Sequence, residues 1–207
     1  MNNTAAGAVN HQRDLIKTLQ EYNHNGIVTS ILLHACCAPC ASSCLEVLDG
    51  YADITVFFYN PNITVREEYE HRLDEVYRLV KEMQFRHKVS VIAGEYDPES
   101  YFDMAKGLEN EPERGARCVK CYSSRLEKTA KFAADGGYDR FATTLTLSPL
   151  KPAQIINEIG TAISQGLYLP SDFKKNNGYL RSIELSKQFG LYRQNYCGCI
   201  YSRKADA

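Results

Sequence analysis

The sequence predicts an α/β fold, a single domain built on a mostly parallel sheet. Short apolar, β-branched runs alternate with amphipathic segments of about 10 to 19 residues, which is typical of parallel strands joined by right-handed helical crossovers. The 207 residues are 44% hydrophobic, enough for one sizeable core. We expect an N-terminal helix and tail over 1–25 and one α/β domain over 26–207, with a cysteine-containing C-terminal extension.

The first half of the chain supplies five elements. Leu15, Ile16 and Leu19 share one face and predict a helix over 11–22. The apolar run 27–34 predicts a buried strand, followed by a helix over 40–48. A second strand, 54–59, ends at the turn sequence Asn60-Pro61-Asn62. Apolar residues then recur every three or four positions and predict a long surface helix over 65–83.

The second half continues the alternation. We expect a strand at 88–93, helices at 98–108 and 122–134, and a strand at 140–145. Ser148-Pro149 has the form of an N-cap followed by a proline at the first helical position, so a helix is expected to start there. After Leu169 the chain is polar and aromatic, with helical spacing only around 183–189.

Composition excludes some classes of protein. The formal net charge is −1 and no apolar run reaches 18 residues, so we expect no membrane span. Met1–Asn10 does not resemble a signal peptide, because it has neither a basic n-region nor an apolar h-region. We therefore expect a cytoplasmic protein. The charge is unevenly distributed: 61–113 carries 13 acidic and 7 basic residues, a local −6, whereas 114–207 carries 15 basic and 7 acidic residues, a local +8. A basic half suits a polyanion such as nucleic acid.

Polar and cysteine residues follow several predicted strands at their carboxyl ends. Cys36-Cys37 follows the first strand, Asn60-Pro61-Asn62 the second, and Thr143-Thr144 with Ser148 the fourth. In open parallel sheets, ligands bind outside the carboxyl ends of the strands. We therefore expect the chemistry of this protein at that edge.

Eight cysteines are unusual in a chain expected in a reducing compartment, where structural disulfides are rare. Seven form three separate groups: Cys36-Cys37 with Cys40, Cys118 with Cys121, and Cys197 with Cys199. The CxxC spacing lets two thiolates reach one metal ion or cluster edge. Groups from such distant segments can meet only at a folded site, which favours metal binding.

Three chemistries fit these thiols: an iron–sulfur cluster, a zinc site and a thiol–disulfide pair. Seven thiols are more than one tetrahedral ion uses, which favours a cluster plus a second function. The alternative is a cytosolic thiol–disulfide oxidoreductase, with Cys37 and Cys40 as a thioredoxin-like pair acidified by a helix terminus. That alternative leaves the other two groups without a role. A zinc-stabilised RNA-binding module is the third hypothesis.

Longer motifs resemble the cobalamin-independent epoxyqueuosine reductases, the QueH family. The resemblance covers roughly 30–202 and rests on these segments: Leu32-Leu33-His34-Ala35-Cys36-Cys37-Ala38-Pro39-Cys40, Tyr59-Asn60-Pro61-Asn62-Ile63, Cys118-Val119-Lys120-Cys121-Tyr122, Arg125-Leu126, Phe141-Ala142-Thr143-Thr144-Leu145, Ser148-Pro149, Lys151, Asp172-Phe173-Lys174-Lys175, Ser182 through Leu185, and Tyr192-Arg193-Gln194-Asn195-Tyr196-Cys197-Gly198-Cys199. Cys44 lies outside the pattern, and we expect it to pack in the core.

The resemblance implies a HUP-like or Rossmann-like domain and the last step of queuosine synthesis. In that step, the epoxide on the modified base at the tRNA wobble position is reduced to an alkene with loss of water. A [4Fe–4S] cluster can supply the two electrons singly, and an adjacent second iron could act as a Lewis acid on the epoxide oxygen. The expected partners are tRNA and an electron donor.

The roles implied for the thiols have two arrangements. In the preferred one, Cys36, Cys37, Cys118 and Cys121 hold the cluster, while Cys197 and Cys199 form a redox-active pair or, with Cys40, hold the second iron. In the rival arrangement, Cys37, Cys118, Cys121 and Cys197 hold the cluster and Cys36, Cys40 and Cys199 hold the second metal. The sequence does not separate them.

Other residues are expected to serve the substrate. Asp172 is a candidate proton donor or metal ligand, with pairing to Lys174 or Lys175 as the structural alternative. Phosphate contacts are expected from Lys174, Lys175, Arg181 and Arg193. Base stacking is expected from Tyr192, with Tyr179 and Tyr196 as further candidates. His34 is expected to be a core residue.

Overall fold

The computed structural model describes residues 9–203. Four parallel strands form one sheet in the order β3-β2-β1-β4. Their bounds are β1 Thr29–His34, β2 Ala52–Phe58, β3 Val89–Ala93 and β4 Arg140–Thr143. The α/β class with a parallel sheet is confirmed. The predicted absence of a signal peptide concerns Met1–Asn10, most of which lies outside the described residues.

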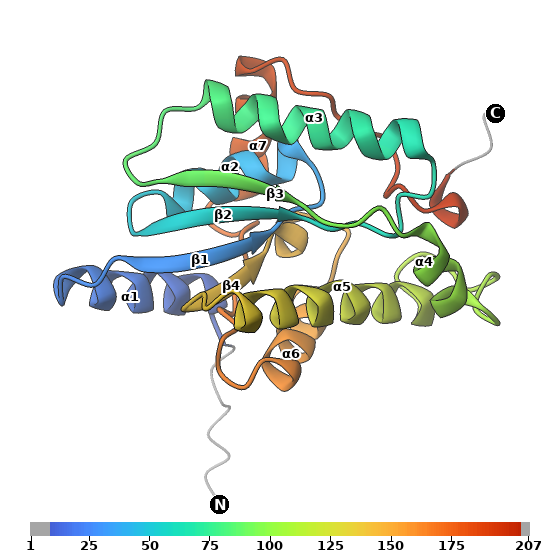
Figure 1. Ribbon diagram of the computed structural model, residues 1–207, viewed down its shortest axis with the longest axis horizontal. Helices are drawn as coiled ribbons and strands as arrows, with labels where there is room; N and C mark the ends of the chain where they lie inside the picture. The colour runs from blue at the N-terminus through green and yellow to red at the C-terminus, as the bar shows by residue number, and fades with distance from the viewer. Residues whose placement is uncertain (1–8, 204–207) are drawn as a thin grey trace, which may run out of the picture.

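Helices cover both faces of the sheet (Figure 1). One face is covered by α2 (Ala38–Leu48), α3 (Arg66–Glu82) and α7 (Gly178–Gln188). The other is covered by α5 (Ala116–Asp135) and α6 (Ala153–Ile163). No helix in the described part of the chain is long and apolar enough to cross a bilayer.

Alternate residues of β1 point into two different cores. Ile31 and Leu33 belong to the larger core under α2 and α3, whereas Leu32 packs beneath α5 and α6, as the two-residue period of a strand requires. All three side chains are fully buried, and so is Cys44 in the larger core. The sequence-based placement of Cys44 is therefore confirmed.

The first helix, α1 (His11–His24), lies beside β4. The side chains of Leu15 and Leu19 enter the larger core, and Arg140 of β4 donates a hydrogen bond of 2.6 Å to the Tyr22 hydroxyl. The predicted helix over 11–22 is therefore confirmed, and its apolar face is held by the sheet.

Three predicted helix starts were wrong, and one of them is that of α7, which begins at Gly178 rather than near 183. α5 begins at Ala116 rather than at Tyr122, so Cys118 and Cys121 lie on the helix itself, three residues apart on one face. α6 begins at Ala153, not at Ser148. Ser148 instead ends the short helix η1 (Thr144–Leu147). Lys151 precedes Pro152, whose ring disfavours helical geometry at the residue before it, so the helix starts only after that proline.

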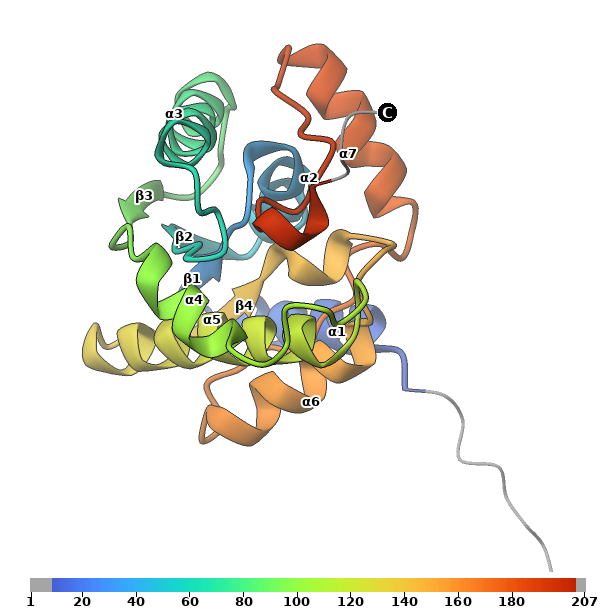
Figure 2. The same ribbon diagram turned by 90° about the vertical axis from the view of Figure 1, so that its right-hand side faces the viewer.

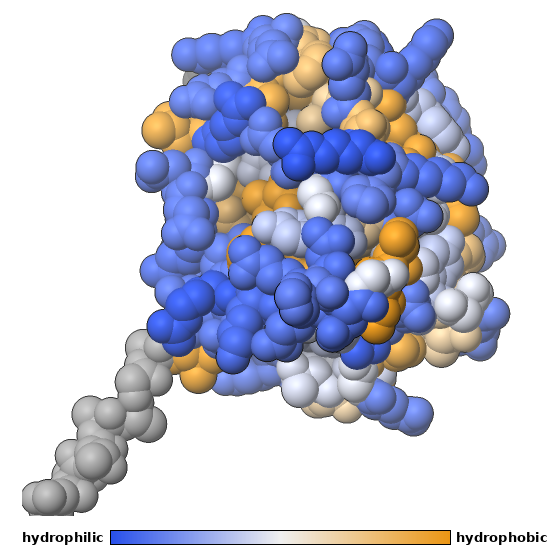
Figure 3. Space-filling model, turned by 90° about the vertical axis from the view of Figure 1, so that its left-hand side faces the viewer, coloured by the Kyte–Doolittle hydropathy of each residue, from blue (hydrophilic) through white to orange (hydrophobic). Residues whose placement is uncertain are grey.

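The two ends of the sheet differ. Figure 2 looks towards the carboxyl ends of the strands, where η2 (Ile200–Ser202), the start of α2 and η1 come together. The opposite end, seen in Figure 3, is covered mainly by hydrophilic side chains around a hollow. Asn23, Met83 and Phe85 are among the residues that line a hollow at that end.

Candidate metal centre and active site

The carboxyl ends of three strands are tied together directly beneath the first cysteines. His34 Nδ1 lies 2.8 Å from Thr143 Oγ1, and His34 Nε2 lies 3.1 Å from the Tyr59 carbonyl oxygen. The Cys36 amide donates to Thr144 Oγ1 at 3.3 Å. Burial lowers the pKa of His34 to about 3, so the imidazole is neutral and structural. The expected gathering of candidate residues at this edge is confirmed, as is the core position of His34.

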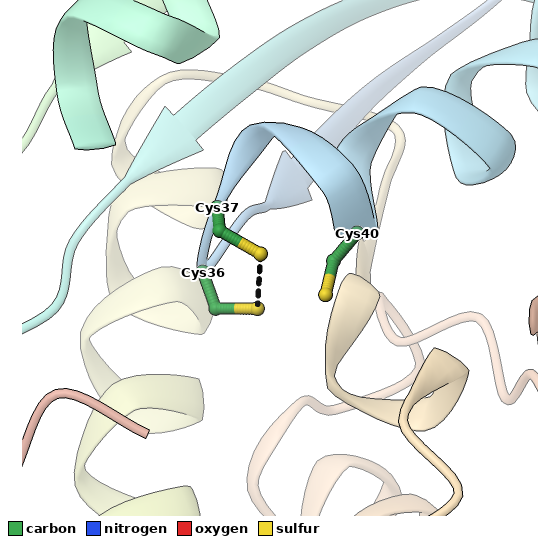
Figure 4. A group of neighbouring side chains, drawn as sticks. All are labelled: Cys36, Cys37 and Cys40. Atoms are coloured by element: carbon green, nitrogen blue, oxygen red, sulfur yellow. Dashed lines mark hydrogen bonds between the residues drawn. The ribbon is translucent and has the colours of Figure 1, made fainter. Parts of the chain in front are cut away.

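Cys36, Cys37 and Cys40 form one compact group, here called the three-thiol group. Cys37 is the N-cap of α2, and Cys40 follows in the first turn. The three Sγ atoms lie within 4.8 Å of one another (Figure 4), and those of Cys36 and Cys37 are 3.8 Å apart. Two thiolates on one tetrahedral ion, with metal–sulfur bonds of about 2.3 Å, lie about 3.8 Å apart. The group can therefore hold a metal ion.

Cys118, Cys121, Cys197 and Cys199 form a second group, here called the four-thiol group. They line one small cavity together with Tyr101 and Tyr122. Cys118 and Cys121 come from the first two turns of α5, whereas Cys197 and Cys199 come from the C-terminal segment. Because Cys197 also lines the cavity of the three-thiol group, the two groups are neighbours.

Side chains outside the cysteine motifs hold the C-terminal segment in place. Asn62 Nδ2 donates to the Cys197 carbonyl oxygen at 3.1 Å, and Arg72 Nη1 donates to the same oxygen at 3.4 Å. Arg72 is 2% exposed and forms an ion pair of 2.6 Å with Glu68, one turn earlier on α3. The position of Cys197 therefore depends on β2–α3 residues more than 120 positions earlier.

A cavity of about 450 Å³ opens beside the three-thiol group. Four cysteines line it: Cys36, Cys37, Cys40 and Cys197. Four cationic residues line it as well, Arg72, Arg125, Lys151 and Arg193, against a single carboxylate, that of Glu113. The volume is in the range of small-molecule sites, and the charges suit an anionic occupant.

The thiols of the three-thiol group differ in acidity. Hydrogen bonds from the Cys37 and Cys40 thiols hold the pKa of Cys36 well below its usual range, and the charges of Lys151 and Arg125 add to the shift. The hydrogen bonds that Cys37 and Cys40 make with Cys36 raise the pKa values of these two thiols. Cys36 is therefore the most acidic thiol of the group, and the thiolate is the nucleophilic and metal-binding form of cysteine.

The four-thiol group is more apolar. Burial raises the pKa of Cys121 to about 12, against the nearby Arg125 charge, and burial also raises the pKa of Cys118. Thiols in such surroundings lose their protons only when a metal replaces them. Cys118 and Cys121 are therefore suited to hold a metal that displaces their protons.

Two cations, the buried Arg125 and the half-buried Lys151, support the fit of a negatively charged thiolate–metal group. Arg125 is 1% exposed and donates to Asn60 Oδ1, while its Nε is left without a partner among the described residues. The pKa of Lys151 is raised above its usual value: burial acts to lower it, but the nearby Cys197, Cys36 and Cys40 have the larger combined effect. Neither cation pairs with a carboxylate within residues 9–203. An isolated buried charge is costly, and a thiolate–metal group at these cysteines would supply the compensating negative charge.

Asp172 and Lys174 form an ion pair of 2.5 Å with each other, and neither lines the cavity. Lys174 also donates to the Thr146 carbonyl oxygen at 3.4 Å, so the pair lies behind η1. Lys175 is exposed in the following turn. The structure thus brings these three residues together with one another but not with the thiols.

Arg193 and Tyr192 are adjacent in sequence but lie in different surroundings. Arg193 lines the cavity and donates to Ser186 Oγ at 3.0 Å. Tyr192 lines a separate hollow, where its hydroxyl donates to the Glu68 carboxylate at 3.2 Å and its ring packs against His71. Of the predicted substrate residues, Arg193, Tyr179 and Tyr196 line the cavity. Arg181 does not line it and is paired with Glu46 and Glu184 instead.

Sequence analysis gave no role to three residues that shape this site. Arg125 and Lys151 were noted only as parts of family motifs, and Arg72 was counted as part of a surface helix. The CxxC group followed by a helical pattern could have indicated Arg125, which lies one helical turn after Cys121. No local pattern distinguishes Arg72 from the exposed arginines of α3.

Comparison with known proteins agrees with this site. The family model described as "Epoxyqueuosine reductase QueH" matches residues 31–205. Three relatives named epoxyqueuosine reductase QueH illustrate the similarity. The Streptococcus pyogenes serotype M1 protein is 42% identical over 95% of this chain and 79% of its own length. The Staphylococcus epidermidis protein is 44% identical over 94% and 84%, and the Thermotoga maritima protein is 36% identical over 84% and 90%.

Proposed function

This chain belongs to the QueH family of epoxyqueuosine reductases, and on that premise we propose that it reduces epoxyqueuosine at the tRNA wobble position to queuosine. The reaction consumes two electrons and two protons, converts the epoxide to an alkene and releases its oxygen as water. One observation carries the proposal for this chain: three remote cysteine segments meet beside a cationic cavity of about 450 Å³. The tRNA substrate also supports a cytoplasmic location.

We propose that the thiols hold a [4Fe–4S] cluster and a second iron. When bound, a cluster supplies low-potential electrons one at a time. In the preferred arrangement Cys36, Cys37, Cys118 and Cys121 hold the cluster. Cys36 and Cys118 pack against the same core, which supports their sharing one group. The rival arrangement exchanges Cys36 for Cys197, and Cys197 is the thiol that lines both cavities.

The chain's own residues bind and orient the RNA in this proposal. Arg193 faces the cavity, and Lys175 is exposed to solvent. Both positions support contacts to RNA phosphates. Lys174 and Tyr192 are proposed as further RNA contacts, and both are anchored by carboxylates, Lys174 by Asp172 and Tyr192 by Glu68. These anchors would hold the two side chains in place before the RNA arrives.

Cys197 and Cys199, together with Asp172, are the remaining proposed catalytic residues. If Asp172 donates a proton, Asp172→Asn lowers kcat. If it only orients Lys174, the same variant raises KM for the RNA and leaves kcat unchanged. Steady-state kinetics on the RNA substrate separates these two roles.

Nucleoside analysis tests the proposed function. A bacterial strain without its own epoxyqueuosine reductase accumulates epoxyqueuosine in tRNA, which mass spectrometry detects. Expressing this chain should replace epoxyqueuosine by queuosine, whereas Cys121→Ala should not. The control Cys44→Ala removes a thiol that lies in the core instead, and should restore queuosine. Persistent epoxyqueuosine with well-expressed wild-type protein would refute the proposal. The electron donor is expected to be a separate protein or reductant of the host.

A further inference from the structure

Three of the four cations that line the cavity are already held by protein partners. Arg72 is paired with Glu68, Arg125 donates to Asn60, and Arg193 donates to Ser186. The ammonium of Lys151 makes no hydrogen bond or ion pair within residues 9–203. Lys151 is therefore the cavity cation whose donors remain free for a bound molecule, and an ammonium offers three of them.

The backbone around Lys151 is fixed. Its amide donates to the Ser148 carbonyl oxygen at 3.1 Å, and Ser148 Oγ accepts from the Leu150 amide at 3.2 Å. Pro152 follows and α6 begins at Ala153. The turn aims Lys151 between the two thiol groups, since its side chain lines both the larger cavity and the small cavity of the four-thiol group.

We propose that Lys151 is a catalytic residue whose ammonium donates a hydrogen bond to the epoxide oxygen of the substrate. This inference rests on the proposed function. As the two C–O bonds break, the two ring carbons form the C=C bond. The oxygen carries away both bonding electron pairs, and the two electrons that the reductase delivers complete the carbon–carbon bond. Two protons, supplied in the end by water, convert that oxygen to a water molecule.

Lys151 stabilises the negative charge that the oxygen gains during this step. A fixed donor aimed at a developing oxyanion accelerates a reaction more than it strengthens substrate binding. Asp172, the donor suggested by the sequence, lies outside the cavity and is paired with Lys174. The described residues offer no other free ammonium at the cavity.

The test compares Lys151→Gln with Lys151→Arg, and uses Lys131→Gln as a charge-matched control. Lys131 is exposed on α5 and is paired with Asp135. Lys151→Gln should lower kcat about a hundredfold, the cost of losing one oxyanion donor, with little change in KM. Lys151→Arg should recover part of that loss, and Lys131→Gln should match the wild type. Iron and sulfide content and the melting temperature are measured on each variant.

Binding supplies a readout that does not depend on turnover. An anticodon stem-loop with epoxyqueuosine differs from one with queuosine by the oxygen that Lys151 is proposed to contact. The metal-free wild type should bind the epoxide form about three- to tenfold more tightly, as one added hydrogen bond allows, and Lys151→Gln should bind both forms equally. This comparison decides the matter even if Lys151→Gln loses metal.

The outcomes separate the two proposals. An unchanged kcat in Lys151→Gln, or unchanged discrimination between the two stem-loops, overturns the role of Lys151 and leaves the reductase function standing. A fully metal-loaded wild type that converts no epoxyqueuosine overturns the proposed function, and the role of Lys151 with it.

Discussion

The three-thiol group and the four-thiol group are neighbours that the fold builds in different ways. Cys36, Cys37 and Cys40 come from five consecutive residues where β1 meets α2, and their Sγ atoms lie within 4.8 Å of one another. The four-thiol group needs α5 and the C-terminal segment to meet across the sheet edge. The first group has a local origin, and the second exists only in the folded chain.

The two thiol groups also differ in the acidity of their thiols and in their access to solvent. The three-thiol group borders the open cationic cavity and presents one acidic thiol, Cys36. The four-thiol group is enclosed by Tyr101 and Tyr122, and burial raises the pKa of Cys121. An acidic thiol beside an open cavity suits substrate or an exchangeable ion, whereas an enclosed site suits a group that stays bound. Four perturbations of decreasing effect test this contrast.

Removing one thiol from each group should have the largest effect. Cys121→Ala should lose the brown chromophore and the activity together, because Cys121 is a cluster ligand in both proposed arrangements. Cys40→Ser should keep the chromophore but lose one iron per chain and the activity. Anaerobic purification followed by an absorbance scan, iron and sulfide analysis and a reductase assay measures the chromophore, the iron content and the activity.

Cys44→Ala is the matched control for these variants, since Cys44 is fully buried in the core. It should keep iron, colour and activity at a cost of about 1 kcal/mol in the free energy of unfolding. A fully coloured, active Cys121→Ala variant would contradict the proposal that the two groups act as one centre.

Disturbing the support of the four-thiol group should have the next largest effect. Arg72→Gln leaves Glu68 without its buried partner, so the free energy of unfolding should fall by about 3 kcal/mol. The hydrogen bond to the Cys197 carbonyl oxygen is lost as well, and iron content should drop.

Arg78→Gln is the control for Arg72→Gln on the same helix. Arg78 is more exposed and donates to the Phe189 carbonyl oxygen rather than to Cys197. It should cost less than about 1 kcal/mol and keep iron. Denaturant unfolding with iron analysis compares the variants, and equal iron loss in both would show that Arg72 has no special role at Cys197.

Acid should weaken the support beneath the three-thiol group. The pKa of His34 is about 3 in the folded chain and about 6.5 when unfolded, so the unfolded state takes up a proton first as pH falls. The contribution of neutral His34 is complete above the unfolded pKa and is lost towards pH 3.

Between pH 8 and pH 5 the free energy of unfolding of the metal-free protein should therefore fall by about 2 kcal/mol through His34. His34→Gln should flatten that part of the pH profile, and His24→Gln, at an exposed position of α1, should not. A profile of His34→Gln parallel to the wild type would contradict a neutral buried His34.

The smallest effect is expected at the rim of the cavity. Arg193→Glu should weaken binding of an anticodon stem-loop and lower the slope of log Kd against log salt by about one unit. Lys131→Glu, on the far part of α5, should leave the slope closer to that of the wild type. An unchanged slope for Arg193→Glu would place the RNA backbone elsewhere.

Local patterns predicted the sheet and the three-thiol group well. The strands were found because each is a short apolar run with a turn or cysteine motif after it, and the helix α3 because its apolar spacing is long and regular. The starts of α5, α6 and α7 were misplaced. Gly115 and Pro152 begin α5 and α6 without a side-chain cap, so the usual N-terminal signal is missing.

The rest of the site depends on tertiary contacts that no local pattern encodes. Arg72 and Arg125 lie on regular helices, where periodicity alone marks polar residues as exposed, yet both are almost fully buried. By contrast, the pairing of Asp172 with Lys174 is local, and the sequence had already offered it as the alternative to a proton-donor role. The free ammonium of Lys151 becomes evident only when the partners of the other cavity cations are known.

The central claim is that the two thiol groups form one centre that reduces epoxyqueuosine in RNA. The most direct measurement incubates anaerobically purified, metal-loaded protein with an epoxyqueuosine-containing anticodon stem-loop and dithionite, and identifies the nucleosides by mass spectrometry. The account predicts queuosine, with loss of one oxygen atom, from the wild type and Cys44→Ala and none from Cys121→Ala. Unchanged epoxyqueuosine with the metal-loaded wild type, or full conversion by Cys121→Ala, would contradict it.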